Sequence, residues 1–122
     1  MKDHRFIKGR LKSFKYAANG AFKLVTTEHS VMVQFLLGVL VTIAGFCFNI
    51  SSTEWMLQTL AIGVVLGIEG VNTAIEKVAD FIHPDYHERI GFIKDIAAGA
   101  VFFAALAALA VGGLIYCPKI FG

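Results

Sequence analysis

Charge is scarce in this 122-residue chain: Asp, Glu, Lys and Arg make up 16% of the residues, and hydrophobic residues make up 57%. Residues 29–53, 55–68 and 96–118 contain no Asp, Glu, Lys or Arg at all. A soluble domain of this size carries more charge and fewer apolar residues, so the composition argues against one. Because about 20 apolar residues cross a bilayer, the first and third stretches predict transmembrane helices directly.

Cysteine and proline are also rare, with two of each. Cys47 and Cys117 fit neither a disulfide framework nor a metal site, and we interpret them as apolar packing residues near the outer ends of two spans. The chain has no GxxxxGK sequence followed by Ser or Thr, which excludes the usual P-loop for nucleotide phosphates. It has no HExxH sequence either, and Pro84 between His83 and His87 makes a helical zinc site a poor interpretation.

The middle charge-free stretch reaches spanning length only if its helix continues to about residue 82, carrying acidic residues partway into the membrane. We therefore predict an all-α membrane protein with a single domain over residues 1–122. It would have an N-terminal amphipathic surface helix over about 5–27 and transmembrane helices over about 30–50, 55–82 and 94–117. The segment 83–94 is expected to form a loop, because a proline disfavours helical geometry in the residue before it.

Positive charge is concentrated at the N-terminus, where residues 1–23 hold seven Lys or Arg against one Asp. Positively charged segments stay in the cytoplasm, which predicts a cytoplasmic N-terminus and a cytoplasmic 83–94 loop. Apolar residues recur at steps of four and three over 6–25, with lysines on the adjoining face, so this helix should lie among the lipid headgroups. The alternative is a basic tail that only fixes the topology. No nucleic-acid partner is expected, since the basic helix leads directly into a span.

Small residues recur every four positions in two of the expected spans. They are Gly63 and Gly67 in the second span, and Ala100, Ala104, Ala108 and Gly112 in the third. Such stripes let helices approach one another closely in lipid. Since three short spans enclose little interior, we expect the chain to form an oligomer.

Four polar residues share one face of the second expected span: Glu69, Asn72, Glu76 and Asp80. Counted from Trp55 at the outer interface, Glu69 lies roughly 21 Å into a bilayer core of ~30 Å, with Glu76 near its inner edge. A charged group at that depth costs about 2–3 kcal/mol, so it usually pairs, binds a cation or takes part in chemistry. For a lone glutamate, a polar contact between helices is an equally good interpretation. The full stripe, with Glu28 available at the same height, favours a functional site.

Oxygen ligands with no sulfur and little histidine suit Mg²⁺, which keeps bound waters and is shared between carboxylates and phosphates. Lys94 and Asp95 open the third expected span at the same interface, next to Tyr86 and His87 in the loop. A mobile lysine beside a magnesium site is what a bound polyphosphate needs.

The sequences "EGVNTAIEKVAD", "HPDYHE" and "IKDIAAGAVF" resemble the signature of the prokaryotic diacylglycerol kinase family, which are small membrane enzymes with three spans. "SFKYAANG", Glu28 and "TEW" extend the resemblance over roughly residues 6–116. It implies a homotrimeric lipid kinase of the bacterial plasma (inner) membrane, with active sites shared between subunits and facing the cytoplasm. Such an enzyme moves the γ-phosphoryl group of MgATP to the hydroxyl of diacylglycerol or undecaprenol, giving phosphatidic acid or undecaprenyl phosphate.

The resemblance also implies roles for individual residues. Glu69 matches the catalytic base, Asn72 a supporting polar residue, and Lys94 a cation that neutralises phosphate charge. Glu28 and Glu76 match the ligands of Mg²⁺. The positions that contact ATP in the family correspond to Arg10, Tyr16, Asp85, Tyr86, His87, Lys94 and Asp95.

The chain departs from the family pattern at three positions. The N-terminal arginine is displaced by one residue to Arg10, Met32 stands where an arginine is common, and Gly70 replaces a bulkier apolar residue beside Glu69. We expect Gly70 to widen the cleft for the lipid. The motifs look more like the Gram-positive branch, whose members often prefer undecaprenol, but the residues themselves do not decide between the two acceptors.

Two other classes of protein account for part of the pattern. A small proton- or cation-coupled transporter would use Glu69 between its helices, but it leaves Glu28, Lys94 and Asp95 unexplained. A noncatalytic membrane subunit would explain only the small-residue stripes. The lipid kinase accounts for all of these features and is our prediction.

Overall fold

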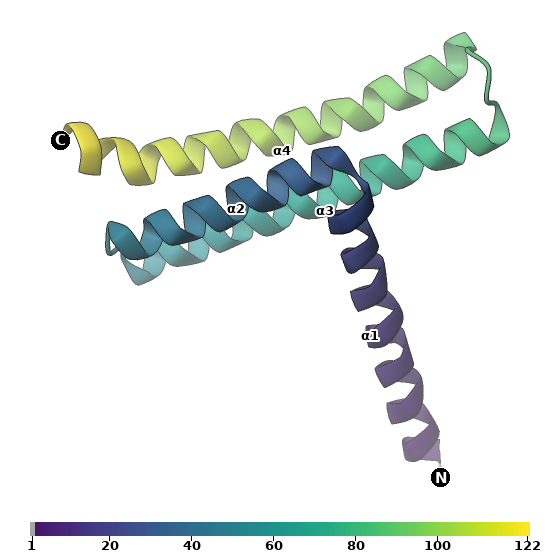
Figure 1. The fold of residues 1–122 in the computed structure, drawn as a ribbon, viewed down its shortest axis with the longest axis horizontal. Coiled ribbons are helices and arrows are strands. Elements are labelled where there is room, and N and C mark those ends of the chain that lie inside the picture. The colour runs from purple at the N-terminus through teal and green to yellow at the C-terminus, as the bar shows by residue number, and fades with distance from the viewer. Residues whose placement is uncertain (1) are drawn as a thin grey trace.

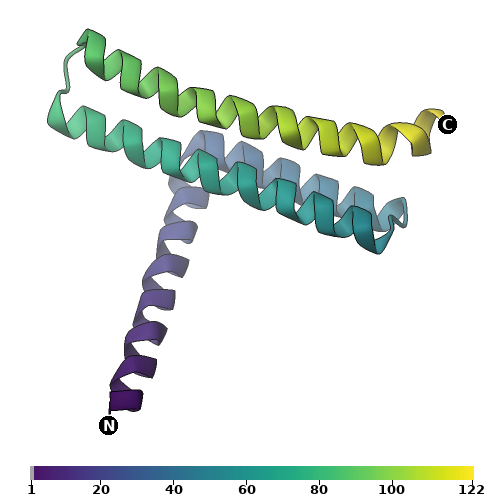
Figure 2. The same ribbon diagram turned by 180° about the vertical axis from the view of Figure 1, so that it is seen from behind.

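The computed structural model describes residues 2–122, which form four helices and no strand (Figure 1). The helices are α1 (Lys2–Thr27), α2 (His29–Cys47), α3 (Ser52–Ile82) and α4 (Glu88–Phe121). The last three run lengthwise beside one another, and α1 leaves this bundle across their direction, as both views show (Figures 1 and 2). The predicted all-α fold is confirmed.

Three of the helices, α2, α3 and α4, are long and apolar enough to cross a membrane. They contain 19, 31 and 34 residues, which correspond to about 29, 47 and 51 Å at the usual rise of ~1.5 Å per residue. This agrees with the predicted membrane protein of three spans. Since α3 and α4 exceed the ~30 Å thickness of a bilayer core, their ends extend beyond it.

The connection between α3 and α4 is shorter than predicted. The chain is helical again from Glu88, so the loop covers residues 83–87, and the predicted loop over 83–94 is wrong. His87 caps the new helix, because its Nδ1 accepts a hydrogen bond from the Arg89 backbone N–H at 3.1 Å. Glu88 adds a negative charge in the first turn, where the helix dipole favours one. These local contacts start α4 before its apolar stretch begins.

A single extended residue, Glu28, separates α1 from α2. Its backbone has φ −106° and ψ 115°, while its N–H still donates to the Leu24 carbonyl at 3.2 Å and its carbonyl accepts from the Met32 N–H at 2.9 Å. The chain therefore changes direction here with little loss of backbone hydrogen bonding (Figure 1). This bend puts the Glu28 side chain where α1, α2 and α3 come together.

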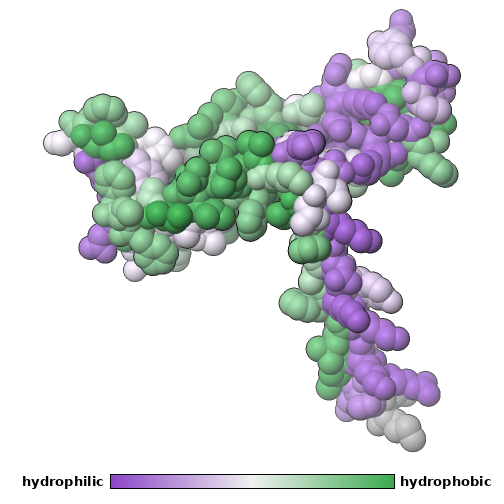
Figure 3. All heavy atoms as spheres, viewed as in Figure 1, coloured by the Kyte–Doolittle hydropathy of each residue, from purple (hydrophilic) through white to green (hydrophobic). Residues whose placement is uncertain are grey.

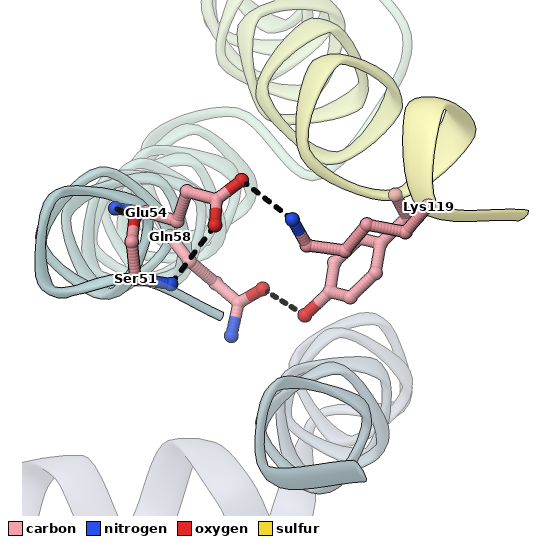
Figure 4. Close-up of polar contacts among 5 residues, drawn as sticks. Ser51, Glu54, Gln58 and Lys119 are labelled. Atoms are coloured by element: carbon pink, nitrogen blue, oxygen red, sulfur yellow. Dashed lines mark hydrogen bonds and ion pairs between the residues drawn. The ribbon is translucent and has the colours of Figure 1, made fainter. Parts of the chain in front are cut away.

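At the opposite end of the bundle, polar contacts join α3 to α4 (Figure 4). The Ser51 hydroxyl and the Glu54 carboxylate form a capping box at the start of α3, with hydrogen bonds of 3.2 and 2.9 Å. The same carboxylate contacts Lys119 Nζ at 3.1 Å through its second oxygen. Glu54 thus caps the start of α3 and also forms an ion pair with the last turns of α4.

One turn further into the bundle, the buried Gln58 links all three long helices. Its Oε1 accepts a hydrogen bond from the Tyr116 hydroxyl at 2.6 Å, and its Nε2 donates to the Val41 carbonyl at 3.3 Å. Gln58 is only 4% exposed, so these partners satisfy an amide that would otherwise be costly in an apolar interior. The end of the bundle opposite the α3–α4 loop is therefore held together by hydrogen bonds as well as by packing.

Few apolar side chains are buried within the single chain, and most of the large ones are exposed. Figure 3 shows hydrophobic residues over the middle of the bundle and hydrophilic residues gathered at the end that carries the α3–α4 loop. An added Cβ at Gly63 or Gly67 would meet no atom within 4 Å, so this part of the predicted stripe is open in the described chain. An apolar surface of this extent suits contact with lipid or with another chain.

Candidate active site

The polar stripe predicted on α3 becomes more exposed from one residue to the next toward the α3–α4 loop. Glu69 is buried, Asn72 is half-buried, and Glu76 and Asp80 are exposed. Asn72 Nδ2 donates a hydrogen bond to Glu76 Oε1 at 3.3 Å, one helical turn away. The stripe therefore leads from the apolar body of the bundle to its hydrophilic end.

Glu69 is 7% exposed, and its side chain has an unsatisfied oxygen. No donor among residues 2–122 reaches Glu69 Oε2, and the same holds for Asn72 Oδ1, which lies one turn further on. A buried acceptor without a donor is costly, so such atoms call for a binding partner. The two oxygens are suited to accept hydrogen bonds from a hydroxyl-bearing ligand.

Glu28 connects the bend between α1 and α2 to this stripe. Its Oε1 lies 2.9 Å from Lys77 Nζ, and Lys77 directly follows Glu76 on α3. The ion pair thus places Glu28 against the residue of α3 that follows Glu76, the other residue predicted to bind Mg²⁺. Lys77 was not among the predicted site residues, although a lysine beside two acids of the motif was a visible signal.

Lys94 reaches across from α4 to the end of the stripe on α3. Its Nζ lies 2.6 Å from Asp80 Oδ1. Asp80 belongs to the predicted stripe without a role of its own there, and its carboxylate holds the lysine predicted to neutralise phosphate charge. Asp95, the next residue on α4, is exposed.

The loop of residues 83–87 is ordered by its own contacts. His83 Nδ1 lies 2.6 Å from the Asp85 carbonyl oxygen, and the His83 and His87 rings meet edge to face at 5.5 Å. The Tyr86 ring packs on Gly91, where an added Cβ would come within 3.2 Å of it. The predicted ATP contacts Asp85, Tyr86 and His87 therefore lie at the same end of the bundle as Lys94.

Two predicted ATP contacts lie elsewhere, on α1. The Arg10 guanidinium stacks over the Phe6 ring at 5.7 Å, and Tyr16 is 71% exposed. Because α1 leads away from the bundle, a single chain does not bring these two residues to the carboxylates (Figure 1). Their role in binding ATP stays a prediction.

Gly70 is buried and does not face an open cleft. An added Cβ at this position would lie 2.9 Å from a methyl group of Leu24, near the end of α1. Leu24 thus occupies the space that the sequence led us to assign to the lipid. The glycine allows α1 to pack closely against α3 beside the buried Glu69.

The donor set fits a magnesium ion only if the ion keeps other ligands. Among residues 2–122, no three His, Cys, Asp or Glu side chains are close enough together to hold a metal by themselves. Glu28 and Glu76 supply two hard oxygen donors whose charges both act on the Lys77 ammonium. Mg²⁺ commonly takes one or two carboxylates together with water and phosphate oxygens. The residues present therefore fit a metal that is shared with a phosphate ligand.

Comparison with known proteins identifies the family. Residues 15–116 match the family described as prokaryotic diacylglycerol kinase. The undecaprenol kinase of Bacillus subtilis is 38% identical over 120 residues, which cover 98% of each chain. The diacylglycerol kinase of Synechocystis is 34% identical over 111 residues, covering 90% of this chain and 63% of that protein. The diacylglycerol kinase of Haemophilus influenzae is 25% identical over 107 residues, covering 87% and 91%.

The extent of these matches confirms both the resemblance seen in the motifs and the prediction of an enzyme. The family match covers the stripe on α3, the α3–α4 loop and Lys94, but it leaves out the first 14 residues, which include Arg10. This chain belongs to the prokaryotic diacylglycerol kinase family and is a lipid kinase.

Proposed function

We propose that the chain transfers the γ-phosphoryl group of MgATP to the hydroxyl of a membrane lipid, with Glu69 as the general base. The observation that carries this proposal is the buried Glu69 carboxylate, whose Oε2 has no donor within the described chain. It lies at the apolar end of a polar stripe that leads to a hydrophilic surface (Figure 3). A lipid hydroxyl approaches from the membrane and ATP from the aqueous side, so this is the arrangement that the reaction requires.

In the proposed step, Glu69 Oε2 accepts the proton of the lipid hydroxyl while the hydroxyl oxygen forms a bond to the γ-phosphorus. The bond between the γ-phosphorus and the β,γ-bridging oxygen breaks, and ADP leaves with that electron pair. Lys94, held by Asp80, neutralises charge on the phosphates, and Asn72 holds Glu76. A positioned base typically contributes about 10²–10⁴-fold to the rate.

Glu28 and Glu76 would hold Mg²⁺, which shields the negative charge of the phosphates when it is bound. Three features support this assignment: both side chains carry hard oxygen donors, the charges of both act on the Lys77 ammonium, and Asn72 fixes the orientation of Glu76. The contacts of Glu28 with Lys77 and of Glu76 with Asn72 each use one oxygen, so the second oxygen of each carboxylate could accept a further partner.

The proposed setting is the bacterial plasma (inner) membrane, with the N-terminus and the active site in the cytoplasm. The seven Lys and Arg residues within residues 1–23 support this orientation. Hydrophilic residues lie mainly on one side of α1 and hydrophobic residues on the other (Figure 3). This supports an amphipathic helix that lies in the headgroup region.

We further propose a homotrimer in which α1 of one chain completes the site of another. Arg10 and Tyr16 lie on α1, which leads away from the three long helices, and this supports a site of this kind (Figure 1). The open surface at Gly63 and Gly67 supports close contact with another helix.

Undecaprenol is the acceptor that we favour. The relative named undecaprenol kinase matches this chain from end to end at 38% identity, whereas the two relatives named diacylglycerol kinase are 34% and 25% identical over shorter stretches. Diacylglycerol is the second candidate, because both lipids present one hydroxyl at the end of a long apolar body.

The test is transfer of labelled γ-phosphate from MgATP to lipid in mixed micelles that contain undecaprenol and diacylglycerol together. We expect label in undecaprenol above all, and a loss of at least about 100-fold in the Glu69→Gln variant, because the amide cannot accept the proton as a carboxylate does. Thr73→Ser is a matched control, since it retains the hydroxyl that donates to the Glu69 backbone carbonyl.

Two outcomes would contradict parts of this proposal. Predominant labelling of diacylglycerol would reverse the order of the two acceptors and leave the kinase intact. No label in either lipid, from folded wild-type protein with Mg²⁺ present, would refute the proposed reaction. The proton- or cation-coupled transporter would then be tested by a flux assay in vesicles.

A further inference from the structure

Lys77 lies among three carboxylates at the hydrophilic end of the bundle. Its ammonium contacts Glu28 Oε1 at 2.9 Å, and the negative charges of Asp80 and Glu76 on its own helix also act on it. The Lys77 side chain is 67% exposed, whereas that of Glu28 is 25% exposed. The Lys77 ammonium is therefore held by an ion pair, while most of its side chain is exposed to solvent.

Stabilisation of the fold is a weak explanation for this contact. Ion pairs with one largely exposed partner contribute about 0–1 kcal/mol. The bend at Glu28 is already held by backbone hydrogen bonds to Leu24 and Met32. An ammonium among acids on the site side of α3 is better explained by an anionic ligand that binds there.

Competition for Glu28 links Lys77 to the metal. Lys77 Nζ and a metal ion are both cations that bind the Glu28 carboxylate, and the metal binds it more strongly when phosphate oxygens complete its ligand set. When the metal takes Glu28, the ammonium loses its partner beside a ligand that carries several negative charges. Lysine suits such an exchange, because its flexible stem carries three donors that can be reoriented.

We propose that Lys77 is a nucleotide-binding residue that exchanges partners. It pairs with Glu28 in the nucleotide-free enzyme and moves to the phosphates of ATP when Mg²⁺ binds Glu28. Together with Lys94, which Asp80 holds, it provides the second of two lysines that approach the phosphates from α3 and α4. This inference rests on the proposed function, and the experiment below separates the two.

The first measurement is the affinity of the full-length chain in mixed micelles for the Mg²⁺ complex of AMP-PCP, a non-hydrolysable ATP analogue, by calorimetry. Lys77→Met should weaken binding about tenfold, because it removes a charged donor to phosphate. Lys77→Arg should stay within about threefold, since it retains the charge and donors. Lys119→Met, which removes an equal charge at the opposite end of the bundle, should leave the affinity unchanged.

The second measurement is the binding of Mn²⁺ without nucleotide, from the free-ion signal in electron paramagnetic resonance. Lys77→Met should bind Mn²⁺ more tightly than wild type, because no ammonium competes for Glu28. Opposite changes in the two affinities are the signature of partner exchange. Lys77→Gln, which retains a polar side chain of similar length, replaces Lys77→Met if the apolar variant does not fold.

Two results would overturn the inference. A Lys77→Met affinity for Mg²⁺–AMP-PCP equal to that of Lys119→Met would show that Lys77 does not contact the phosphates, while the wild-type protein still binds nucleotide. Weaker binding of both Mn²⁺ and nucleotide would show that Lys77 only holds Glu28 in place. A wild-type protein that binds no AMP-PCP would instead refute the proposed function, and this inference with it.

Discussion

Asp80 and Lys94 illustrate how the site depends on pairs of residues. Their contact of 2.6 Å joins α3 to α4 and fixes a lysine that would otherwise have many rotamers. Asp80→Asn should therefore raise KM for MgATP and lower kcat, with a combined loss of about tenfold in kcat/KM. Steady-state kinetics would measure it, with Glu88→Gln, an exposed acid in the first turn of α4, as the control.

A double-mutant cycle tests whether Asp80 acts by holding Lys94 in place. Once Lys94→Met has removed the lysine, Asp80→Asn should add little further loss, because the aspartate acts through that lysine. Fully additive losses would show that Asp80 has an independent role.

Gly70 gives a second prediction for a single residue. A side chain at this position would push Leu24 away from α3, beside the buried Glu69. We expect Gly70→Leu to lower turnover of both short-chain and long-chain lipids, with partial recovery when Leu24→Ala makes room. Turnover of two diacylglycerols of different chain length measures this. A loss that Leu24→Ala does not reduce would mean that the new side chain blocks the lipid instead.

Which site residues the sequence could reveal depends on how far apart their partners are. The stripe from Glu69 to Asp80 follows from helical periodicity, so its residues were predictable. Lys77 was missed because its partner Glu28 lies far away in the sequence, between α1 and α2, and the two meet only because the chain bends at Glu28 itself. The sequence does not show the direction of that bend.

For whole helices, the charge-free runs were sufficient to predict three spans, because the bilayer requires long apolar segments. The start of α4 was not predictable in this way, since His87 and Glu88 begin the helix through local contacts in a polar stretch. The pairing of Gln58 with Tyr116 was missed for a related reason. Each is a single polar residue in an apolar run, and periodicity does not show which helix it faces.

That pairing leads to a prediction about stability. Tyr116→Phe removes the hydrogen bond to Gln58 and should lower the free energy of unfolding by about 0.6 kcal/mol and at most by about 1.7 kcal/mol, the average and the maximum for hydrogen bonds between helices in a membrane protein. Unfolding in mixed micelles by increasing SDS would measure it. Tyr86→Phe, which changes an exposed side chain in the loop, is the matched control. Kinase activity of Tyr116→Phe under stable conditions should stay at the wild-type level, because Gln58 lies about three helical turns from Glu69 on α3, on the side away from the α3–α4 loop.

At the scale of the whole molecule, the single chain leaves most of its large apolar side chains exposed. Its long helices bury few large side chains, Gly63 and Gly67 meet nothing within 4 Å, and α1 extends from the bundle with little contact beyond its last turns. Lipid can cover the apolar surface, but lipid cannot provide Arg10 and Tyr16 with the carboxylates that they would need to share a nucleotide. A second copy of the chain can cover part of the apolar surface and also supply those carboxylates.

Mixing two defective variants tests this arrangement. Glu69→Gln disables the carboxylate half of a site, and an Arg10→Ala/Tyr16→Ala double variant disables the α1 half, so each should lose activity alone. If α1 of one chain completes the site of another, an equal mixture that is allowed to exchange subunits should recover about one quarter of wild-type activity, because that share of sites combines two intact halves. Native mass spectrometry of the same mixture in mild detergent should show trimers that contain both variants. Mixed trimers without recovered activity would mean that each chain builds its own site, and a purely monomeric protein would refute the trimer.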